Sequence, residues 1–328
     1  MNDLEYGYLK SKILSLTGIN LDNYKSGQMR RRLEGFIDRT QGLDVTLYSK
    51  RLDQNPELLQ DLQDFLTINV SEFFRDTQAF EVLQTQVIPL MLKRSQRLNI
   101  WSAGCSIGAE PYSLAMILRK LSPGGQHRIL ATDLDEKILA KAKAGGPYSA
   151  AEVKGVPREF ADKHLVADGG SYRVAEHIRQ RVEFRRHDLL TGPPESGFDL
   201  IVCRNVTIYF TSKAKDFLYN GFTGALKDEG VLFLGGTEAL LGFQELGLKR
   251  VHTSFYQKTG HGAADIHPRG VSQSAVGTTD APGKVLSKVE GGSGPCVESP
   301  LDISRQEWSW AGRCIPATDT SCWTRAPS

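Results

Sequence analysis

The chain has 328 residues and a net charge of +2, so it is long enough for one large or two medium domains, and its charge does not call for nucleic acid or a membrane surface as a partner. No apolar run is long enough to span a bilayer, and the first five residues do not resemble a signal peptide. The five cysteines include no CxxC pair, which argues against a metal site. We therefore expect a cytoplasmic protein with reduced thiols.

Up to about residue 95 the chain is predicted to be helical, because apolar residues recur at helical spacing without strand-like alternation. We expect helices near residues 6–15, 23–40, 45–52, 56–66 and 78–93. A helical N-terminal domain is predicted over residues 1–78. The second helix is basic; a solvated face is the usual role of such charges, and a docking surface for an acidic protein is the alternative. Its basic residues are Lys25, Arg30, Arg31, Arg32 and Arg39.

The segment before the fifth helix carries a dense set of polar side chains. Ser71 is compatible with an ordinary helix cap. A cap does not explain why Asn69, Ser71 and Arg75 come together just before the next domain.

From residue 98 strands and helices alternate, which predicts an α/β domain with a mostly parallel sheet. Strands are expected near residues 99–103, 128–132, 182–185, 199–203, 231–235, 249–251 and 254–257, and helices near 109–121, 135–144 and 212–226. This domain should cover residues 79–259, with a small insertion at about 147–181 that holds a helix and a hairpin. Residues 260–328 are rich in Gly, Ser, Pro, Thr and Ala, and we predict a disordered tail.

The turn after the first strand predicts a ligand site. Gly104 and Gly108 allow close approach of a ligand to the backbone, although tight turns also use glycine for packing. The chain contains neither GxxxxGK[ST] nor GxGxxG. Glu110 would repel a pyrophosphate at this position. It suits a cation, such as the amino group or the sulfonium of S-adenosylmethionine.

Polar side chains also follow the second and fourth strands. Asp133 is placed to accept hydrogen bonds from a ribose, whereas a helix cap is the plain alternative for either Asp133 or Asp135. Asn205 and Tyr209 follow the fourth strand, at the edge where open α/β sheets bind ligands. Each could singly be a cap or a packed side chain, but their joint position favours a site.

Four stretches together resemble the CheR-type chemotaxis receptor methyltransferases. They are TINVSEFFRD (67–76), WSAGCSIGAEPYSLAM (101–116), ATDLDEKILAKAKAGGPY (131–148) and FDLIVCRNVTIYF (198–210). The resemblance covers roughly residues 5–258. It implies a Rossmann-like S-adenosylmethionine-dependent methyltransferase domain with an inserted β-subdomain, preceded by an all-α domain. The implied reaction is methylation of glutamate side chains on chemoreceptor cytoplasmic domains by a monomeric enzyme.

The resemblance also implies roles for individual residues. Arg75 and Tyr209 would be catalytic, and the basic helix would dock the receptor. The cofactor would be bound by Asn69, Ser71, Arg75, Gly104, Glu110, Asp133, Asp188, Leu189, Asn205 and Val206. The chain departs from the family at Ile107, Ala109 and Asp188; the loss of polar groups from the turn is expected to weaken cofactor binding without abolishing it. The hairpin turn is short, so we do not expect a tether for a receptor tail.

The implied reaction does not require the enzyme to activate the nucleophile. A glutamate carboxylate has a reference pKa of about 4.3 and is already a nucleophile at neutral pH, so no general base is needed. Alignment and partial desolvation would supply the rate, with Arg75 and Tyr209 orienting the carboxylate. Two alternatives stay open: a methyltransferase of the same fold with another target, and a non-catalytic adenosylmethionine-binding signalling protein.

Overall fold

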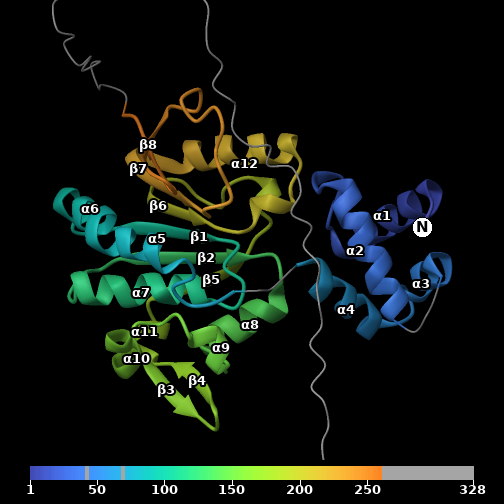
Figure 1. The fold of residues 1–328 in the computed structure, drawn as a ribbon, viewed down its shortest axis with the longest axis horizontal. Coiled ribbons are helices and arrows are strands. Elements are labelled where there is room, and N and C mark those ends of the chain that lie inside the picture. The colour runs from blue at the N-terminus through green and yellow to red at the C-terminus, as the bar shows by residue number, and fades with distance from the viewer. Residues whose placement is uncertain (41–43, 68–70, 261–328) are drawn as a thin grey trace, which may run out of the picture. The chain divides into compact units, whose positions relative to one another are not determined.

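The protein is described here by a computed structural model that covers residues 1–40, 44–67 and 71–260 (Figure 1). Asn69 and, apart from Gly260, the predicted tail therefore lie outside the described residues.

The first part of the chain folds into short helices around a core of its own. This core takes its buried side chains from Tyr6 through Leu66. Local signals set the helix ends: Asn2 forms a capping box with Glu5, and Gly18 ends the first helix at a φ of 76°. The elements are α1 (Asp3–Thr17), η1 (Leu21–Asn23), α2 (Ser26–Arg39), α3 (Val45–Arg51) and α4 (Pro56–Leu66).

The next helix is interrupted by one wide turn. It runs as α5 (Thr77–Val82), a π-helical segment η2 (Leu83–Val87) and α6 (Ile88–Arg94). Pro89, in the first turn of α6, cannot donate to the carbonyl four residues earlier, and the π segment absorbs that break. The N-cap is Asp76, whose side chain accepts from the Ala79 amide, so Ser71 is not the cap.

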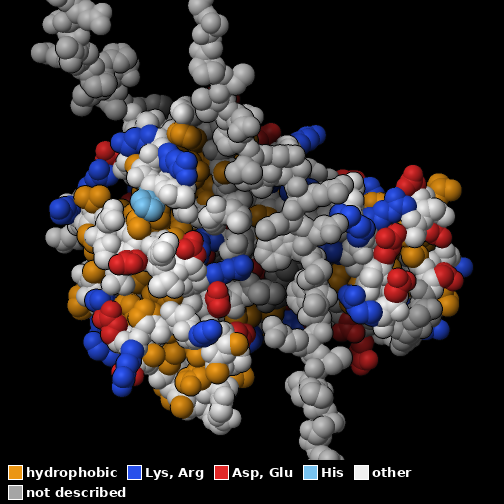
Figure 2. Space-filling model, viewed as in Figure 1, with side chains coloured by type: hydrophobic (Ala, Val, Ile, Leu, Met, Phe, Trp, Pro, Cys, Tyr) orange, Lys and Arg blue, Asp and Glu red, His pale blue; other side chains and the backbone are white. Residues whose placement is uncertain are grey.

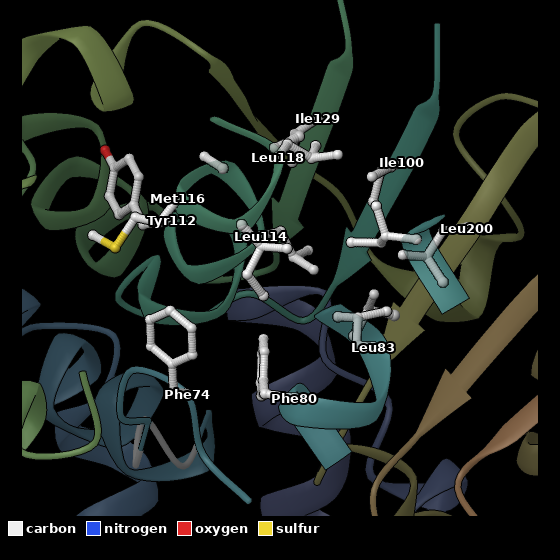
Figure 3. Packing of buried hydrophobic residues seen from close by; sticks show 14 of the residues in the cluster. Phe74, Phe80, Leu83, Ile100, Tyr112, Leu114, Met116, Leu118, Ile129 and Leu200 are labelled. Carbon is white, nitrogen blue, oxygen red and sulfur yellow. The ribbon is translucent and has the colours of Figure 1, made fainter. Parts of the chain in front are cut away.

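These helices belong to the sheet rather than to the first core. Phe74, Phe80 and Leu83 pack with the strand residues Ile100 and Leu200 in one cluster (Figure 3). The core therefore changes between Leu66 and Phe73, earlier than the predicted end of the helical domain at residue 78.

A seven-stranded sheet forms the centre of the rest of the chain, in the order β5-β2-β1-β6-β7-β9-β8. All pairs up to β7 are parallel, and β9 is antiparallel to both β7 and β8. The strands are β1 (Asn99–Ala103), β2 (Arg128–Asp133), β5 (Val182–Arg186), β6 (Phe198–Cys203), β7 (Leu226–Leu234), β8 (Leu248–His252) and β9 (Phe255–Lys258). Each of these strands was predicted, although β7 begins five residues before its predicted start.

Both faces of the sheet are buried, as expected for parallel strands. Alternate residues of β1 point to opposite sides: Ile100 packs with α5, α6 and α7 (Ala109–Leu121), whereas Trp101 packs with α12 (Ser212–Ala225). Figure 1 shows α7 and α12 on opposite sides of the strands. The predicted α/β architecture is confirmed.

The predicted insertion contains the expected hairpin, formed by β3 (Leu165–Asp168) and β4 (Ser171–Val174), which turns at Gly169 and Gly170. It also holds more helix than predicted. The helices there are α9 (Ala150–Val153), α10 (Arg158–His164) and α11 (Glu176–Arg179). They follow α8 (Glu136–Ala144), which was predicted.

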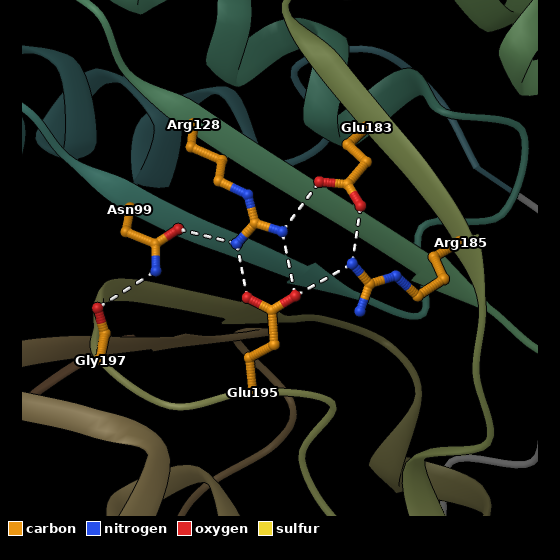
Figure 4. Close-up of polar contacts among 6 residues, drawn as sticks. All are labelled: Asn99, Arg128, Glu183, Arg185, Glu195 and Gly197. Carbon is orange, nitrogen blue, oxygen red and sulfur yellow. Dashed lines mark hydrogen bonds and ion pairs between the residues drawn. The ribbon is translucent and has the colours of Figure 1, made fainter.

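An ion-pair network joins the starts of β2 and β5 to the connection between β5 and β6 (Figure 4). Arg128 of β2 donates to both carboxylate oxygens of Glu195, at 2.6 and 3.0 Å. Glu183 of β5 accepts from Arg128 at 2.8 Å and from Arg185 at 2.7 Å. Glu195 lies on the connection between β5 and β6, so the network anchors one end of that connection.

Candidate functional site

A pocket opens at the carboxyl ends of the parallel strands. The strand order reverses between β1 and β6, and in open α/β sheets ligands bind outside the strand ends at such a reversal. The pocket is lined by residues at the ends of β1, β2, β5 and β6 and in the segments that follow them. The chain before the sheet adds Tyr24, Leu66, Thr67, Ser71, Glu72 and Arg75. The catalytic and cofactor-binding residues that the resemblance implies all line it, within the described part of the chain: Ser71, Arg75, Gly104, Glu110, Asp133, Asp188, Leu189, Asn205, Val206 and Tyr209.

The two glycines of the first turn have different functions. Both have a left-handed φ, 80° at Gly104 and 84° at Gly108. A Cβ on Gly104 would lie 2.6 Å from Val206 Cγ2, across the pocket wall. A Cβ on Gly108 would meet Ala142 at 2.9 Å and Phe184 at 3.2 Å. Gly108 therefore serves core packing, which corrects the expectation that both glycines admit a ligand.

The two unusual residues of that turn lie in the core. Ile107 and Ala109 are buried among the hydrophobic residues behind the turn, and neither lines the pocket. The Ile107 carbonyl accepts a hydrogen bond of 2.8 Å from the Tyr148 hydroxyl. Any effect of these two residues on cofactor binding would therefore have to pass through the packing behind the turn, and the expected weakening of that binding stays a prediction.

Asp133, the last residue of β2, and Asp135, two residues later, have different roles. Asp135 is the N-cap of α8 and accepts from the amides of Lys137 and Ile138. Asp133 faces the pocket, where its oxygens accept from the Ser106 amide at 2.7 Å and the Asp135 amide at 3.1 Å. Burial raises the pKa of Asp133, and the two amides oppose that rise. An acidic side chain is thus held at the end of β2 with lone pairs left for further donors.

A buried pair of opposite charges lies at the start of α7. Glu110 Oε2 is 3.8 Å from Arg204 Nη1, and the Ser102 hydroxyl donates to Glu110 Oε1 at 2.8 Å. Burial raises the pKa of Glu110, whereas Arg204 and Ser102 lower it. Arg204 also donates to the Arg75 carbonyl at 2.8 Å. Arg204 was not predicted, although its position directly after a buried strand could have indicated a functional charge.

The segment after β5 forms a third side of the pocket. Asp188 caps the short helix η3 (Leu189–Thr191) by accepting from the Leu190 amide at 2.9 Å. Leu189 is buried beside it. Tyr24, which was not predicted, lies in the same wall; burial, followed by the charges of Asp188 and Asp133, raises its pKa to about 12. This wall is therefore apolar with a polar edge.

Tyr209 is fixed by contacts with the helical part of the chain. It ends the short helix η4 (Thr207–Tyr209), and its carbonyl accepts from the Lys25 amide at 3.0 Å. The Thr211 amide donates to the Asn23 carbonyl at 2.9 Å, and together these bonds form a β-bridge between Tyr24 and Phe210. We call this contact the Tyr24–Phe210 bridge.

The basic residues of α2 have different surroundings. Arg32 donates to the Phe65 carbonyl and its guanidinium lies 5.9 Å from the centre of the Tyr209 ring. Arg30 pairs with Asp3. Acidic and basic side chains are mixed over the visible face of the helical part (Figure 2), so no single charge dominates there. The exposed members of the predicted docking set are Lys25, Arg31 and Arg39.

In the described residues no cluster of His, Cys, Asp and Glu could hold a metal ion. None of the helices in the described ranges is both long and apolar enough to cross a membrane.

Comparison with known proteins identifies the family. The model of the CheR methyltransferase all-alpha domain matches residues 4–67, and that of the CheR methyltransferase SAM-binding domain matches residues 69–254. The chemotaxis protein methyltransferase of Listeria innocua is 40% identical over 260 residues, which is 78% of this chain and 99% of that protein. Chemotaxis protein methyltransferase 1 of Pseudomonas aeruginosa is 39% identical over 237 residues, 68% of this chain and 85% of that protein.

A solved TehB-like SAM-dependent methyltransferase from Corynebacterium glutamicum aligns with 53% of this chain and 84% of its own, at 18% identity and a TM-score of 0.32, which is too slight a likeness to carry weight. The two family models, by contrast, together cover residues 4–67 and 69–254, and the Listeria innocua relative aligns over nearly its whole length. The chain therefore belongs to the CheR methyltransferase family, and its cofactor is S-adenosyl-L-methionine.

Proposed function

We propose that the protein methylates glutamate side chains on the cytoplasmic domains of chemoreceptors, giving glutamate methyl esters and S-adenosylhomocysteine. The observation that carries the proposal is the joining of two features in one pocket. Carboxylates suited to a cationic cofactor line the same pocket as Arg75 and Tyr209, the residues proposed to orient the substrate. The names of the relatives, which are chemotaxis methyltransferases, support the same reading.

The donor set of the pocket fits the cofactor. Glu110 and Arg204, opposite charges 3.8 Å apart, are complementary to the ammonium and carboxylate of a methionine moiety. Asp133 would accept from the ribose hydroxyls, as acidic residues at the end of a second strand do in nucleotide-binding folds. Tyr24 and Leu189 offer apolar surface for the adenine, with Asp188 at its edge. Ser71, Gly104, Asn205 and Val206 would complete the enclosure, and Asn69 stays a prediction.

The chain need only bind and align the reactants. When bound, S-adenosylmethionine supplies a methyl group on a sulfonium, a good leaving group. The substrate carboxylate is ionised at neutral pH, so the enzyme needs no base. Arg75 and the Tyr209 hydroxyl would orient that carboxylate by hydrogen bonds and exclude part of its water. Alignment of the carboxylate with the methyl group, rather than proton transfer, would supply the catalysis.

The basic helix α2 is suited to bring the substrate to this pocket. Lys25 at its N-cap donates its amide to Tyr209, so the exposed basic residues begin directly beside the catalytic position. An acidic helical surface of a receptor would meet Lys25, Arg31 and Arg39 while one of its glutamates enters the pocket. Rim charges of this kind speed association and select partners more than they add affinity.

The test is ester formation on a receptor cytoplasmic fragment with a methyl-labelled donor. Methyl esters release methanol in mild base, whereas methylated amines do not, so the assay reports the chemical class of the acceptor. Asp133→Asn and Glu110→Gln should lose cofactor affinity in calorimetry with S-adenosylhomocysteine and lose ester formation with it. Tight binding by the unaltered protein without any transfer would replace the proposal by a non-catalytic adenosylmethionine-binding role.

A further inference from the structure

One buried carboxylate outside the pocket organises the pocket wall. Glu238 lies after β7, its residue is 3% exposed, and it is not among the residues that line the pocket. Its oxygens accept five hydrogen bonds of 2.6–3.0 Å, all of them from the loops that follow β6 and β7. The donors are the amides of Gly235, Asn205, Val206 and Thr207 and the Thr207 hydroxyl.

The carboxylate fills a concave array of backbone donors. Three successive amides, from Asn205 to Thr207, converge on it, with Asn205 at a left-handed φ of 61° and Val206 at a right-handed φ of −107°. Alternation of this kind turns consecutive N–H groups toward one side and makes an anion-binding nest. Asparagine tolerates the left-handed region better than most residues, but it stays there only where the surroundings hold it.

The nest shapes both parts of the proposed site. Val206, whose amide Glu238 binds, stands against Gly104 so closely that a Cβ there would lie 2.6 Å from its methyl group. Thr207, which Glu238 binds twice, begins the helical turn that ends at Tyr209. The wall against the cofactor and the catalytic tyrosine therefore share one anchor.

Access of the carboxylate to the nest also depends on a glycine. A Cβ on Gly235 would lie 2.5 Å from Glu238 Oε2 and 3.2 Å from the Asn205 amide nitrogen. Only glycine leaves room for Glu238 to join the ends of β6 and β7 in this way. The carboxylate, the glycine and the nest fit one another as a unit.

We propose that Glu238 is a positioning residue, which holds the loop from Asn205 to Tyr209 in the shape that binds the cofactor and presents Tyr209 to the substrate. The claim that Glu238 presents Tyr209 to the substrate rests on the proposed function. The claim that it shapes the cofactor wall rests on cofactor binding alone. Both oxygens of Glu238 must accept, so glutamine would turn an NH₂ group toward amide donors and leave at least two of them unsatisfied.

The experiment compares Glu238→Gln with Glu195→Gln. The second variant removes a charge from the ion-pair network at the start of β2, where Glu195 accepts two hydrogen bonds from Arg128. It therefore controls for the loss of a structural carboxylate. Affinity for S-adenosylhomocysteine is measured by calorimetry, turnover by ester formation, and folding by thermal unfolding. We expect Glu238→Gln to lose about ten- to a hundredfold in affinity and more in turnover. Glu195→Gln should stay within about twofold of the unaltered protein in both.

Glu238→Asp keeps two accepting oxygens on a shorter side chain and should recover part of the affinity. If Glu238→Gln unfolds at a lower temperature but keeps affinity and turnover within twofold, Glu238 is merely structural and the inference is overturned. If that variant does not fold, Thr207→Val takes its place, since it removes one donor to Glu238 and the contact to Tyr219. It should bind S-adenosylhomocysteine about threefold more weakly than its control Tyr219→Phe, and equal affinities would overturn the inference.

The two proposals fail separately. An unaltered protein that binds S-adenosylhomocysteine but does not esterify receptor fragments contradicts the proposed function. The affinity comparison between the Glu238 and Glu195 variants still decides whether Glu238 positions the cofactor wall.

Discussion

Replacing Gly104 by alanine would test whether the first turn is closed by the loop across the pocket. The left-handed backbone there costs a non-glycine residue about 1–2 kcal/mol. The new Cβ would lie 2.6 Å from Val206 Cγ2, on a stiff β-branched side chain, and such overpacking costs about 1–3 kcal/mol. The sum, about 2–5 kcal/mol, is a large part of the roughly 5–15 kcal/mol by which a domain is stable.

The assay is urea unfolding of a double-mutant cycle. Val206→Ala removes the methyl group that the new Cβ meets, so Gly104→Ala should cost less in the Val206→Ala background than alone, by about 1–3 kcal/mol. The left-handed backbone cost of about 1–2 kcal/mol should remain in both backgrounds. Gly124→Ala is the matched control, because a Cβ there meets nothing within 4 Å and its φ is not left-handed.

Two results would refute this reasoning. One is a Gly104→Ala protein as stable as the Gly124→Ala protein, which would mean that neither the backbone nor the contact resists the methyl group. The other is strict additivity of Gly104→Ala and Val206→Ala, which would mean that the two residues do not touch in solution.

Three more predictions concern the proposed site. Tyr209→Phe should lower ester formation about ten- to a hundredfold while affinity for S-adenosylhomocysteine changes little, since the hydroxyl acts on the substrate; equal turnover would remove Tyr209 from the mechanism. Because burial raises the pKa of Glu110, affinity for the cationic cofactor should be full above that pKa and fall as the pH decreases through it, starting at a higher pH than for an ordinary glutamate. Ser102→Ala removes a hydrogen bond that lowers the pKa of Glu110 and should move this acid limb to higher pH in calorimetric titrations, and a limb that stays in place contradicts the assignment. A triple alanine variant of the exposed docking residues should lose three ion pairs to the receptor, each worth about 0.5 kcal/mol, and so raise the KM for a receptor fragment about tenfold. The rise in KM should be smallest at high salt, and Lys249→Ala, which removes an exposed charge elsewhere, is the control. If the dissociation constant of S-adenosylhomocysteine rises instead, these residues act at the cofactor. That triple variant replaces with alanine Lys25, Arg31 and Arg39.

The parts of the fold that depend on local chemistry could be predicted. The strands follow from short apolar runs between turn residues, and the pocket residues after β1, β2 and β6 follow from the rule that parallel strands end at one edge. Asp133 and Asp135 show the limit of this reasoning. Two carboxylates two residues apart look alike in sequence, and only the start of α8 decides that Asp135 is the cap.

Roles set by distant contacts could not be predicted. Glu238 is 31–33 residues from the nest amides of Asn205, Val206 and Thr207, and nothing near it in sequence indicates that it binds them. Tyr24 enters the pocket from the helical part of the chain. Gly104 and Gly108 give the same local signal, yet one faces Val206 and the other faces the core. Long-range packing, which periodicity does not encode, decides each case.

The Tyr24–Phe210 bridge has a consequence for how such enzymes acquire new targets. Its two bonds join backbone atoms only, so they do not depend on which side chains α2 displays. The exposed side chains of α2 can therefore change in sequence, or be replaced by those of a relative, without shifting Tyr209. Under the proposed docking role of α2, retargeting would require changes on this one surface, and an engineer could graft it while leaving the methyl-transfer pocket as it is.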